Sequence, residues 1–554
     1  MAQVLSRFAR AEMMLPRCLT SGQQAQRPSG WWRIAYVIFV AELACATSAS
    51  NATCEASPSQ RVDCFGGEAE WQQKGCCWRP VEPNPHNYPW CFHKGSPSPG
   101  PEHQTVGSTF VHLFEWSWPD VAQECEQWLG PKGFRGVQVS PPNDHIAGDA
   151  WWTRYQPVTY KLVSRSGDEA AFAEMVRRCK AAGVDIYVDA VINHIAAGSG
   201  TSIAGSSYGN RATPTYSQQD MHHDAGDVSK NCAISNYADK NNVQYCDLVG
   251  LPDLCTGCEN VQMAIAGYLN NLASLGVAGF RIDAAKHQDA GELAQLLAKV
   301  NGSMWRFGEV ISGANEAVTP NMYFSIMDVT EFDYARKVVP NFLEDGKLQY
   351  LQSFGESWGL MPSDKAVVFL DNHDTQRGEA KLTHTNPGLY QLANIFMLAH
   401  PYGYPKVMSS YFFASHDQGP PREAVHGERG VACGNGRPWV CEHRWPAIAN
   451  MAAWRRAAGA ADVTGFQAHG PDTVAFCRGR AACVALNRGA GAWSASLRLP
   501  AEPGTYCDVI RSDDPATCPR ITVASDGSVR LEVPALGAVA FHIGRKAAET
   551  TISV

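Results

Sequence analysis

The 554-residue sequence predicts an α/β fold: a (β/α)8 TIM barrel, preceded by a small disulfide-rich module and followed by a C-terminal antiparallel β-sandwich. From residue 105 to residue 462, short apolar runs rich in β-branched residues alternate with helical patterns, which is typical of a closed parallel sheet. From residue 463 to residue 545, short strands alternate with turns, which predicts the β-sandwich. Residues 546–554 form a tail.

Seven apolar runs predict strands of the barrel. They are Thr109–Leu113, Gly136–Val139, Asp185–Ile192, Gly279–Ile282, Phe307–Ile311, Val367–Leu370 and Lys406–Met408. Helical patterns over Glu169–Ala182 and Asn260–Leu275 lie between them. Residues 195–257 are rich in Gly, Ser and Asn and are too long for an ordinary connection, so we expect an inserted subdomain after the third strand.

The predicted strands of the C-terminal domain are shorter and more evenly spaced. They are Thr473–Cys477, Cys483–Asn487, Ser494–Leu499, Val529–Val533 and Ala538–Ile543.

The composition excludes several classes of protein. The chain has 46 Lys and Arg residues against 54 Asp and Glu residues, a net charge of −8, which argues against a nucleic-acid partner. A hydrophobic content of 45% with 18% charged residues excludes a disordered chain. The 19 cysteines predict an oxidising, secretory compartment.

Residues 1–50 have the pattern of a signal peptide. A basic stretch precedes the apolar run Ile34–Ala46, and small residues follow it. We therefore expect a secreted, extracellular protein. The alternative is an uncleaved segment that anchors the chain in a membrane of the secretory pathway.

Carboxylates follow the predicted barrel strands at the ends where barrel enzymes place catalysis. Asp283, Glu309 and Asp374 lie at or just after three such strands. Glycoside cleavage needs one carboxylate that attacks the anomeric carbon and a second, protonated one that donates to the leaving oxygen. Arg281 precedes Asp283 by two residues, so we expect it to keep Asp283 ionised. We expect partial burial and a neighbouring carboxylate to raise the pKa of Glu309.

Each of these motifs alone could be a turn, a helix cap or a structural ion pair. Their order and their common strand context favour a shared catalytic site.

Long stretches of the chain then identify a family. They are Val111–Trp116, Gly136–Pro142, Trp151–Pro157, Met361–Asp364 and Cys441–Trp445. With the three carboxylates, they make residues 105–543 resemble the animal-type branch of the α-amylase family of glycoside hydrolases. The resemblance implies that Asp283 is the nucleophile, Glu309 the acid/base, and Asp374 a third carboxylate that binds sugar hydroxyls. It also implies sugar contacts by Trp151, Trp152, Tyr155, Gln156, His194, Arg281, Lys286 and His373.

The same resemblance implies a structural calcium ion between the barrel and the insert. Its ligands would be Asn193, the carbonyl of Gln244, Asp253 and the carbonyl of His287, and oxygen ligands suit this hard cation.

Many animal-type members bind an activating chloride, and here the resemblance is incomplete. Arg281 and Asn372 match the chloride ligands, but Lys406 stands where the family has a second Arg. An ammonium lacks the bidentate geometry of a guanidinium, so we expect an enzyme that needs no chloride. The alternative is that Lys406 binds the anion more weakly.

The resemblance also implies four disulfides, Cys125–Cys179, Cys232–Cys246, Cys433–Cys441 and Cys507–Cys518. Cys255 with Cys258 and Cys477 with Cys483 could pair locally. A metal or redox role for Cys255 and Cys258 is the less favoured alternative.

Residues 51–95 contain five cysteines and resemble a trefoil (P-type) domain through Arg61–Cys64, Gly75–Pro80 and Pro89–Phe92. The resemblance implies the pairs Cys54–Cys77 and Cys64–Cys76. Trp71 replaces the usual third cysteine, which leaves Cys91 without its partner. The module could dock the enzyme on a glycan or mucin, or could be a spacer. The Pro-rich residues 96–104 form a stiff linker.

Taken together, the sequence predicts a secreted, monomeric, endo-acting α-amylase that hydrolyses internal α-1,4-glucosidic bonds of starch or glycogen with retention of configuration. The alternatives are a transglycosylase or an exo-glucosidase on the same barrel, and an inactive amylase-like protein that binds glucan.

Overall fold

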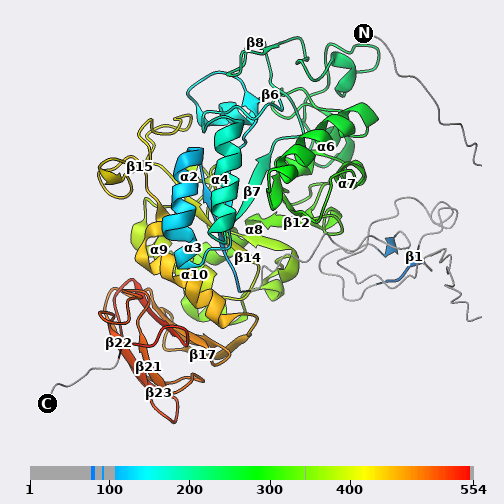
Figure 1. Cartoon of the computed structure of the whole chain (residues 1–554). Coiled ribbons are helices and arrows are strands. Elements are labelled where there is room, and N and C mark those ends of the chain that lie inside the picture. The colour runs from blue at the N-terminus through cyan, green and yellow to red at the C-terminus, as the bar shows by residue number, and fades with distance from the viewer. Residues whose placement is uncertain (1–76, 81–89, 93–106, 344, 549–554) are drawn as a thin grey trace, which may run out of the picture. The chain divides into compact units, whose positions relative to one another are not determined.

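The computed structural model describes residues 77–80, 90–92, 107–343 and 345–548 (Figure 1). In the N-terminal module, β1 (Cys77–Trp78) pairs antiparallel with β2 (Cys91–Phe92). Cys77 is disulfide-bonded. Its predicted partner Cys54 and the predicted pair Cys64–Cys76 lie outside the described residues, as do the signal segment and the linker.

Eight parallel strands close into a barrel. In spatial order they are β3 (Phe110–Leu113), β4 (Gly136–Val139), β7 (Asp185–Ala190), β10 (Gly279–Ile282), β11 (Trp305–Gly308), β12 (Asp328–Glu331), β13 (Ala366–Val368) and β14 (Tyr404–Ser409), which returns to β3. Spatial order follows chain order, and the predicted (β/α)8 barrel is confirmed.

The sequence prediction lacked the strand β12, because its residues Asp328–Glu331 do not form an apolar run. Its two polar residues at the carboxyl end are buried but satisfied. Thr330 donates to the carbonyl of Gly308 (3.2 Å), and Glu331 accepts the backbone N–H of Met361 (2.8 Å). Tertiary hydrogen bonds thus stabilise a strand that hydrophobicity does not indicate.

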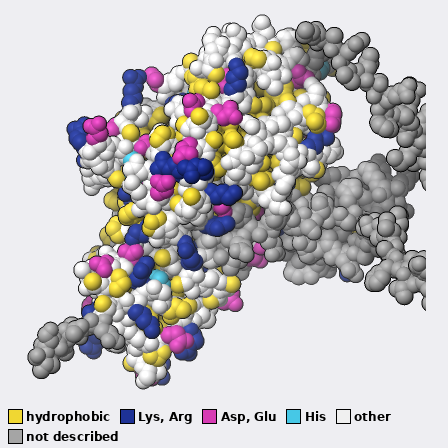
Figure 2. Space-filling model, in the orientation of Figure 1, with side chains coloured by type: hydrophobic (Ala, Val, Ile, Leu, Met, Phe, Trp, Pro, Cys, Tyr) yellow, Lys and Arg dark blue, Asp and Glu magenta, His cyan; other side chains and the backbone are white. Residues whose placement is uncertain are grey.

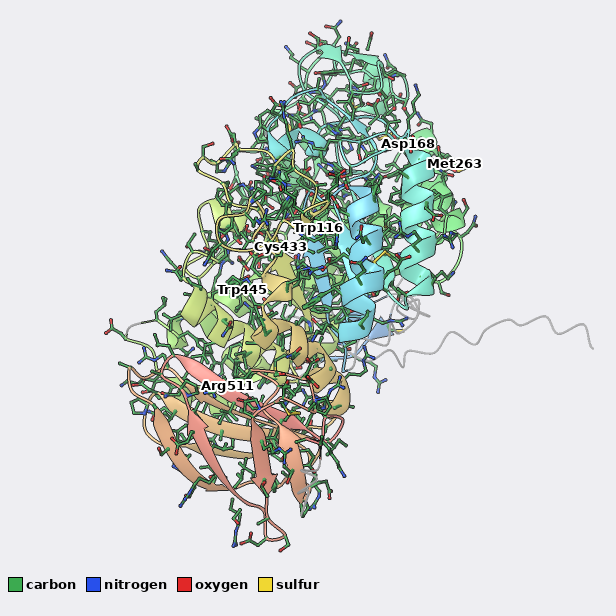
Figure 3. All side chains as sticks on the ribbon, turned by 60° about the vertical axis from the view of Figure 1, so that its left-hand side comes forward. Trp116, Asp168, Met263, Cys433, Trp445 and Arg511 are labelled. Carbon is green, nitrogen blue, oxygen red and sulfur yellow. A yellow bond between two sulfur atoms is a disulfide. The ribbon has the colours of Figure 1, made fainter. Side chains whose placement is uncertain are left out.

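Helices follow the barrel strands (Figure 1). They include α2 (Trp118–Glu124), α4 (Glu169–Ala181), α6 (Glu259–Ser274), α7 (Ala290–Leu297), α8 (Phe332–Val338), α9 (Pro387–Ala399) and α10 (Pro446–Ala458). Ser117 caps α2, and Asp168, at the start of α4 in Figure 3, accepts the backbone N–H of Ala171. Helices α9 and α10 begin with proline, whose fixed φ suits the first helical position.

Large aromatic side chains fill the barrel near the amino ends of its strands. Phe110, Tyr187, Trp305 and Tyr404 belong to one buried cluster. The ring of Phe110 lies 4.7–5.6 Å from the other three. Because this layer closes one end of the barrel, polar groups concentrate at the carboxyl ends of the strands.

The predicted insert follows β7, the third strand of the barrel, and precedes α6. It contains β8 (Gly200–Thr201), β9 (Ser207–Tyr208) and the short helix α5 (Lys240–Tyr245). A bridge between His194 and Asp253 ties the end of the insert to its beginning.

Two four-stranded antiparallel sheets form the C-terminal domain. One contains β17 (Val463–Ala468), β18 (Thr473–Arg478), β19 (Ala482–Asn487) and β24 (Gly537–His542). The other contains β20 (Trp493–Arg498), β23 (Ser528–Val533), β22 (Arg520–Val523) and β21 (Gly504–Cys507). Apolar residues from both sheets share one core, which confirms the β-sandwich.

The disulfides within the described barrel and C-terminal domain are the expected ones. The four pairs that the resemblance implied are present, and Cys255–Cys258 and Cys477–Cys483 pair locally. The disulfide excludes a metal role for Cys255 and Cys258 in this structure.

On the face shown in Figure 2, Lys and Arg side chains are interspersed with Asp and Glu side chains. In the described part of the chain, no helix is both long and apolar enough to cross a membrane.

Candidate active site

Two of the three predicted carboxylates, Asp283 and Glu309, meet at the carboxyl end of the barrel around one guanidinium. Arg281, in β10, is buried, and its Nη1 lies 2.8 Å from Oδ1 of Asp283 and 2.5 Å from Oδ1 of Asp189 in β7. Its Nη2 lies 2.8 Å from Oε1 of Glu309, directly after β11. One cation therefore holds three carboxylates together, and the sequence prediction had named only two of them as site residues.

This sharing changes the expected electrostatics of Asp283. Burial raises the pKa of Asp283 well above its usual range, Arg281 opposes the rise, and the Glu309 and Asp189 carboxylates add to it. Arg281 therefore acts on Asp283 in the expected direction, toward the ionised form, but burial, the largest cause of the shift, outweighs it. The cluster as a whole retains a proton more readily than isolated carboxylates do.

Asp374 is the most exposed of these carboxylates, with 42% of its side chain accessible. Its Oδ2 lies 3.3 Å from Nε2 of His373. Although its outer side is accessible, loss of water on its inner side, followed by the charge of Glu309, raises the pKa of Asp374 to about 7.

The predicted aromatic residues lie beside the carboxylates. Trp151–Tyr155 form a 3-10 turn, in which Trp151 is buried and Trp152 is partly exposed. The Tyr155 ring stacks on His373 at 5.2 Å, and its hydroxyl donates to Asp189 (2.9 Å). Tyr155 thus connects the aromatic turn to the carboxylate cluster.

The histidines of the site are neutral near pH 7. Burial lowers the pKa of His194 to about 4 and lowers that of His373 well below its usual range. Nε2 of His194 donates to the carbonyl of Tyr155 (2.9 Å). Gln156 accepts the backbone N–H of Ala197 (3.1 Å), so its side-chain oxygen is already used within the protein.

Lys286 brings in two residues that the sequence did not indicate. Its Nζ lies 2.5 Å from Oε2 of Glu316 and 4.6 Å from the centre of the Tyr237 ring. Tyr237 comes from the insert and is 40% exposed. No sequence spacing relates these residues to Lys286, because three separate connections bring them together.

The predicted calcium ligands lie in two pairs. The backbone of Leu254 donates to the carbonyl of Asn193 (3.0 Å), which places Asp253 beside Asn193. Nδ1 of His287 donates to the carbonyl of Val243 (3.0 Å), next to Gln244.

Oxygen atoms in this group lack protein partners. Oδ1 of Asn193 and Oδ1 of Asp253 are buried without a hydrogen bond. The carbonyl of Gln244 lies in the last turn of α5, where helical carbonyls have no intrahelical donor. Within the described residues, no three His, Cys, Asp or Glu side chains form a metal-binding group. The predicted set contains one carboxylate, and its remaining ligands are amide or carbonyl oxygens, which a hard cation accepts.

Lys406, in β14, is buried inside the barrel. Its Nζ lies 3.4 Å from Oε1 of Gln138 and 4.8 Å from the centre of the Phe369 ring. Burial and the charge of Arg281 lower the pKa of Lys406 to about 7. Asn372, the other predicted chloride ligand, uses its Oδ1 to accept the backbone N–H groups of Asp374 and Thr375 (3.0 and 2.7 Å).

Comparison with known proteins decides the family. Residues 133–404 match the α-amylase catalytic domain, residues 465–544 the α-amylase C-terminal all-β domain, and residues 53–94 the trefoil (P-type) domain. An α-amylase of Streptomyces violaceus is 45% identical over 78% of this chain and 73% of its own length. An α-amylase of Tenebrio molitor is 40% identical over 79% of this chain and 98% of its own length.

This chain belongs to the α-amylase family. It is a glycoside hydrolase of the α-amylase type. The crystal structure of α-amylase I from Eisenia fetida superimposes with a TM-score of 0.75 at 34% identity, and covers 81% of this chain and 99% of its own. A mutant of the same earthworm enzyme, solved in complex with maltohexaose, gives the same values.

Proposed function

We propose that this α-amylase-family member is secreted and cleaves internal α-1,4-glucosidic bonds of starch or glycogen with retention. The observation that carries the proposal is the Arg281 bridge between Asp283 and Glu309. A retaining site needs its two carboxyl groups about 5 Å apart, and one guanidinium bonded to both favours such a short separation.

The proposed reaction needs a protonated carboxyl group at Glu309 and a carboxylate at Asp283 when substrate binds. The Asp283 carboxylate attacks the anomeric carbon while Glu309 protonates the departing glycosidic oxygen, which forms a covalent glycosyl ester and releases one glucan fragment. Glu309, now ionised, takes a proton from a water molecule that attacks the same carbon. This step breaks the ester and restores both carboxyl groups.

Other side chains position the sugar. Asp374 accepts hydrogen bonds from sugar hydroxyls, and the neutral imidazole of His373 can donate to a sugar oxygen without adding charge. His194, whose N–H donates to the carbonyl of Tyr155, holds the aromatic turn in place. Trp151, Trp152 and Tyr155 offer aromatic surface for stacking on glucose rings. Because the Eisenia fetida relative was solved with maltohexaose, we assign an α-glucan to this site.

A calcium ion fits the oxygens of Asn193, Gln244, Asp253 and His287. Bound there, calcium would supply a structural cross-link between the insert and the barrel. These residues come from the end of β7, α5, the insert and the turn after β10, so they can hold His194 and Lys286 in place.

We further propose that activity does not require chloride, because Lys406 lacks the bidentate geometry with which a guanidinium holds the anion. Secretion is supported by the disulfides of the described chain, which require an oxidising environment to form.

The decisive test follows soluble starch hydrolysis by the secreted full chain with calcium present and chloride absent. Short α-anomeric maltooligosaccharides, lost in Asp283→Asn, are the expected products. Activity that appears only after chloride is added would refute the chloride proposal alone. Glucose released from chain ends, transfer products, or binding without hydrolysis would instead identify an exo-glucosidase, a transglycosylase or an inactive glucan-binding protein.

A further inference from the structure

A cavity of about 250 Å³ lies between helix α8 and the segment that follows Asp374. Its apolar lining includes Phe332, Val339, Phe369 and Leu370, which are almost completely buried. It contains none of the proposed catalytic, sugar-binding or calcium-binding residues, so it is separate from the site that the proposed function uses.

Two aromatic rings define the shape of this cavity. Phe332 and Phe369 meet edge to face, with ring centres 5.1 Å apart and planes at 90°. A third aromatic ring could contact both of them in the arrangements that aromatic pairs prefer. Because a dry cavity of about 150 Å³ accepts benzene, the larger volume here suits one ring with a short tail.

The rim of the cavity carries a lysine that has no ion-pair partner among the described residues. Arg336 is balanced by Glu379 (Nε to Oε1, 2.9 Å) and by Asp333 (Nη1 to Oδ1, 3.2 Å). Lys381, which also lines the cavity, is exposed, and none of the ion pairs found in the described residues involves it. A ligand that leaves an anionic group at this rim would therefore meet Lys381.

We propose that this cavity binds a small aromatic carboxylate. The ring packs against Phe332 and Phe369, and the carboxylate pairs with Lys381. Thr375 and Ala380 form part of the wall, and the backbone of Ala380 donates to the carbonyl of Thr375 (2.8 Å). A bound ligand thus contacts the turn that directly follows Asp374.

The probe for the test is 4-fluorocinnamate, titrated into the full-length protein and followed by fluorine NMR. We expect saturable binding that is about threefold weaker in Lys381→Gln, since an exposed ion pair contributes little. The methyl ester of the probe should bind the unmodified protein about as weakly as the acid binds Lys381→Gln. Ala335→Phe, which fills the cavity, should abolish binding.

Two controls distinguish binding in this cavity from binding elsewhere on the protein. Lys180→Gln removes an exposed lysine on α4 and should leave binding of the probe unchanged. Maltohexaose at saturation in Asp283→Asn should not displace the probe, because the cavity lies outside the proposed glucan site.

Equal binding by the unmodified protein, Lys381→Gln and Ala335→Phe would overturn the proposal, as would displacement by maltohexaose. If Ala335→Phe does not fold, Lys381→Glu replaces it, and its repulsion of the carboxylate should weaken binding more than Lys381→Gln does. Circular dichroism of each variant checks its folding, so failure of the proposed function would not affect the result.

Discussion

The Arg281 guanidinium is the residue on which the chemistry of this site depends. It contacts Asp189, Asp283 and Glu309, each within 2.8 Å. Ionising all three carboxyl groups around one cation costs free energy, because two of the negative charges are left without a positive partner. The group therefore keeps a proton at a pH where free carboxylates have lost theirs. That retained proton is what an acid catalyst needs.

Replacing the proposed acid tests this assignment. Glu309→Gln keeps the size of the side chain but cannot deliver a proton, so kcat on starch should fall by about 10²–10⁴-fold. The loss should be much smaller on a maltosyl fluoride, whose leaving group needs little protonation.

Glu174→Gln, at an exposed ion pair on α4, is the matched control and should keep full activity on both substrates. Equal losses of Glu309→Gln on starch and on the fluoride would show that Glu309 is not the acid.

The residue contacts also show which parts of the site were predictable. Arg281 and Asp283 are two residues apart, and the strand period alone places them on one side of β10. The meeting of Lys286 with Glu316 and Tyr237 was not predictable, because it depends on the path of the insert and of the connection after β11.

At the scale of elements, the segment after β13 is coupled to the helices outside the barrel through buried carboxyl groups. Asp371 accepts from Gln376 (2.8 Å), Gln376 also donates to Ser410 (2.5 Å), and the backbone of Ser410 donates to Glu442 (2.7 Å). Burial raises the pKa of Asp371 to about 7, and burial with the nearby Asp371 raises that of Glu442 to about 8.

These shifts make stability depend on pH. In the unfolded chain both groups lose their protons near pH 4, whereas the folded protein keeps them up to about pH 7–8. The folded state therefore binds more protons in this window, and the free energy of unfolding falls as pH rises through it, by up to about 1.4 kcal/mol per pH unit and group.

Glu442→Gln should remove the Glu442 contribution. The amide is neutral at every pH and can still accept the N–H of Ser410, so its melting temperature should fall less between pH 5 and pH 9 than that of the unmodified protein. Circular dichroism melts at both pH values measure the difference. The melting temperature of the exposed variant Glu174→Gln should depend on pH as it does in the unmodified protein. The same pH dependence in Glu442→Gln would contradict the assignment.

The insert gives a second prediction at this scale. Removing calcium with a chelator should lower the melting temperature. An ion whose free concentration is about 100–1,000 times its Kd stabilises the folded state by about 3–4 kcal/mol. Asp253→Asn should bind calcium more weakly and respond less to the chelator.

Bound calcium, measured by elemental analysis after dialysis, checks the calcium site directly. Asp149→Asn, whose side chain is 99% exposed, is the control. Equal calcium content in Asp253→Asn and the unmodified protein would exclude Asp253 as a ligand.

Across the whole molecule, helix α10 connects the barrel to the C-terminal domain. The indole Nε1 of Trp454 donates to the carbonyls of Cys483 (3.2 Å) and Phe541 (3.0 Å), in two neighbouring strands of the first sheet. Trp454 is fully buried, so these bonds form away from water.

Trp454→Phe keeps an aromatic side chain but loses the shared donor. Unfolding should require about 1–3 kcal/mol less free energy, and the two domains should unfold over more widely separated temperatures in calorimetry. Trp445→Phe, just before α10 (Figure 3), changes a partly buried Trp without this donor pair and should cost less. A single unfolding transition that is unchanged in both variants would show that Trp454 does not couple the two domains.

The sequence by itself determined the family, the barrel, the β-sandwich, four disulfide pairs of the barrel and C-terminal domain, and which side chains end the strands of the site. These properties depend on local periodicity and on long matching segments. Residues that directly follow a strand in the sequence lie at its carboxyl end wherever that strand packs in the fold. It did not reveal β12, whose polar residues are satisfied by the neighbouring strand β11 and by the segment around Met361, nor the division of Arg281 among three carboxylates. Only the tertiary structure decided these points, because a pKa and a buried hydrogen bond depend on every charge and donor nearby, whatever its distance along the chain.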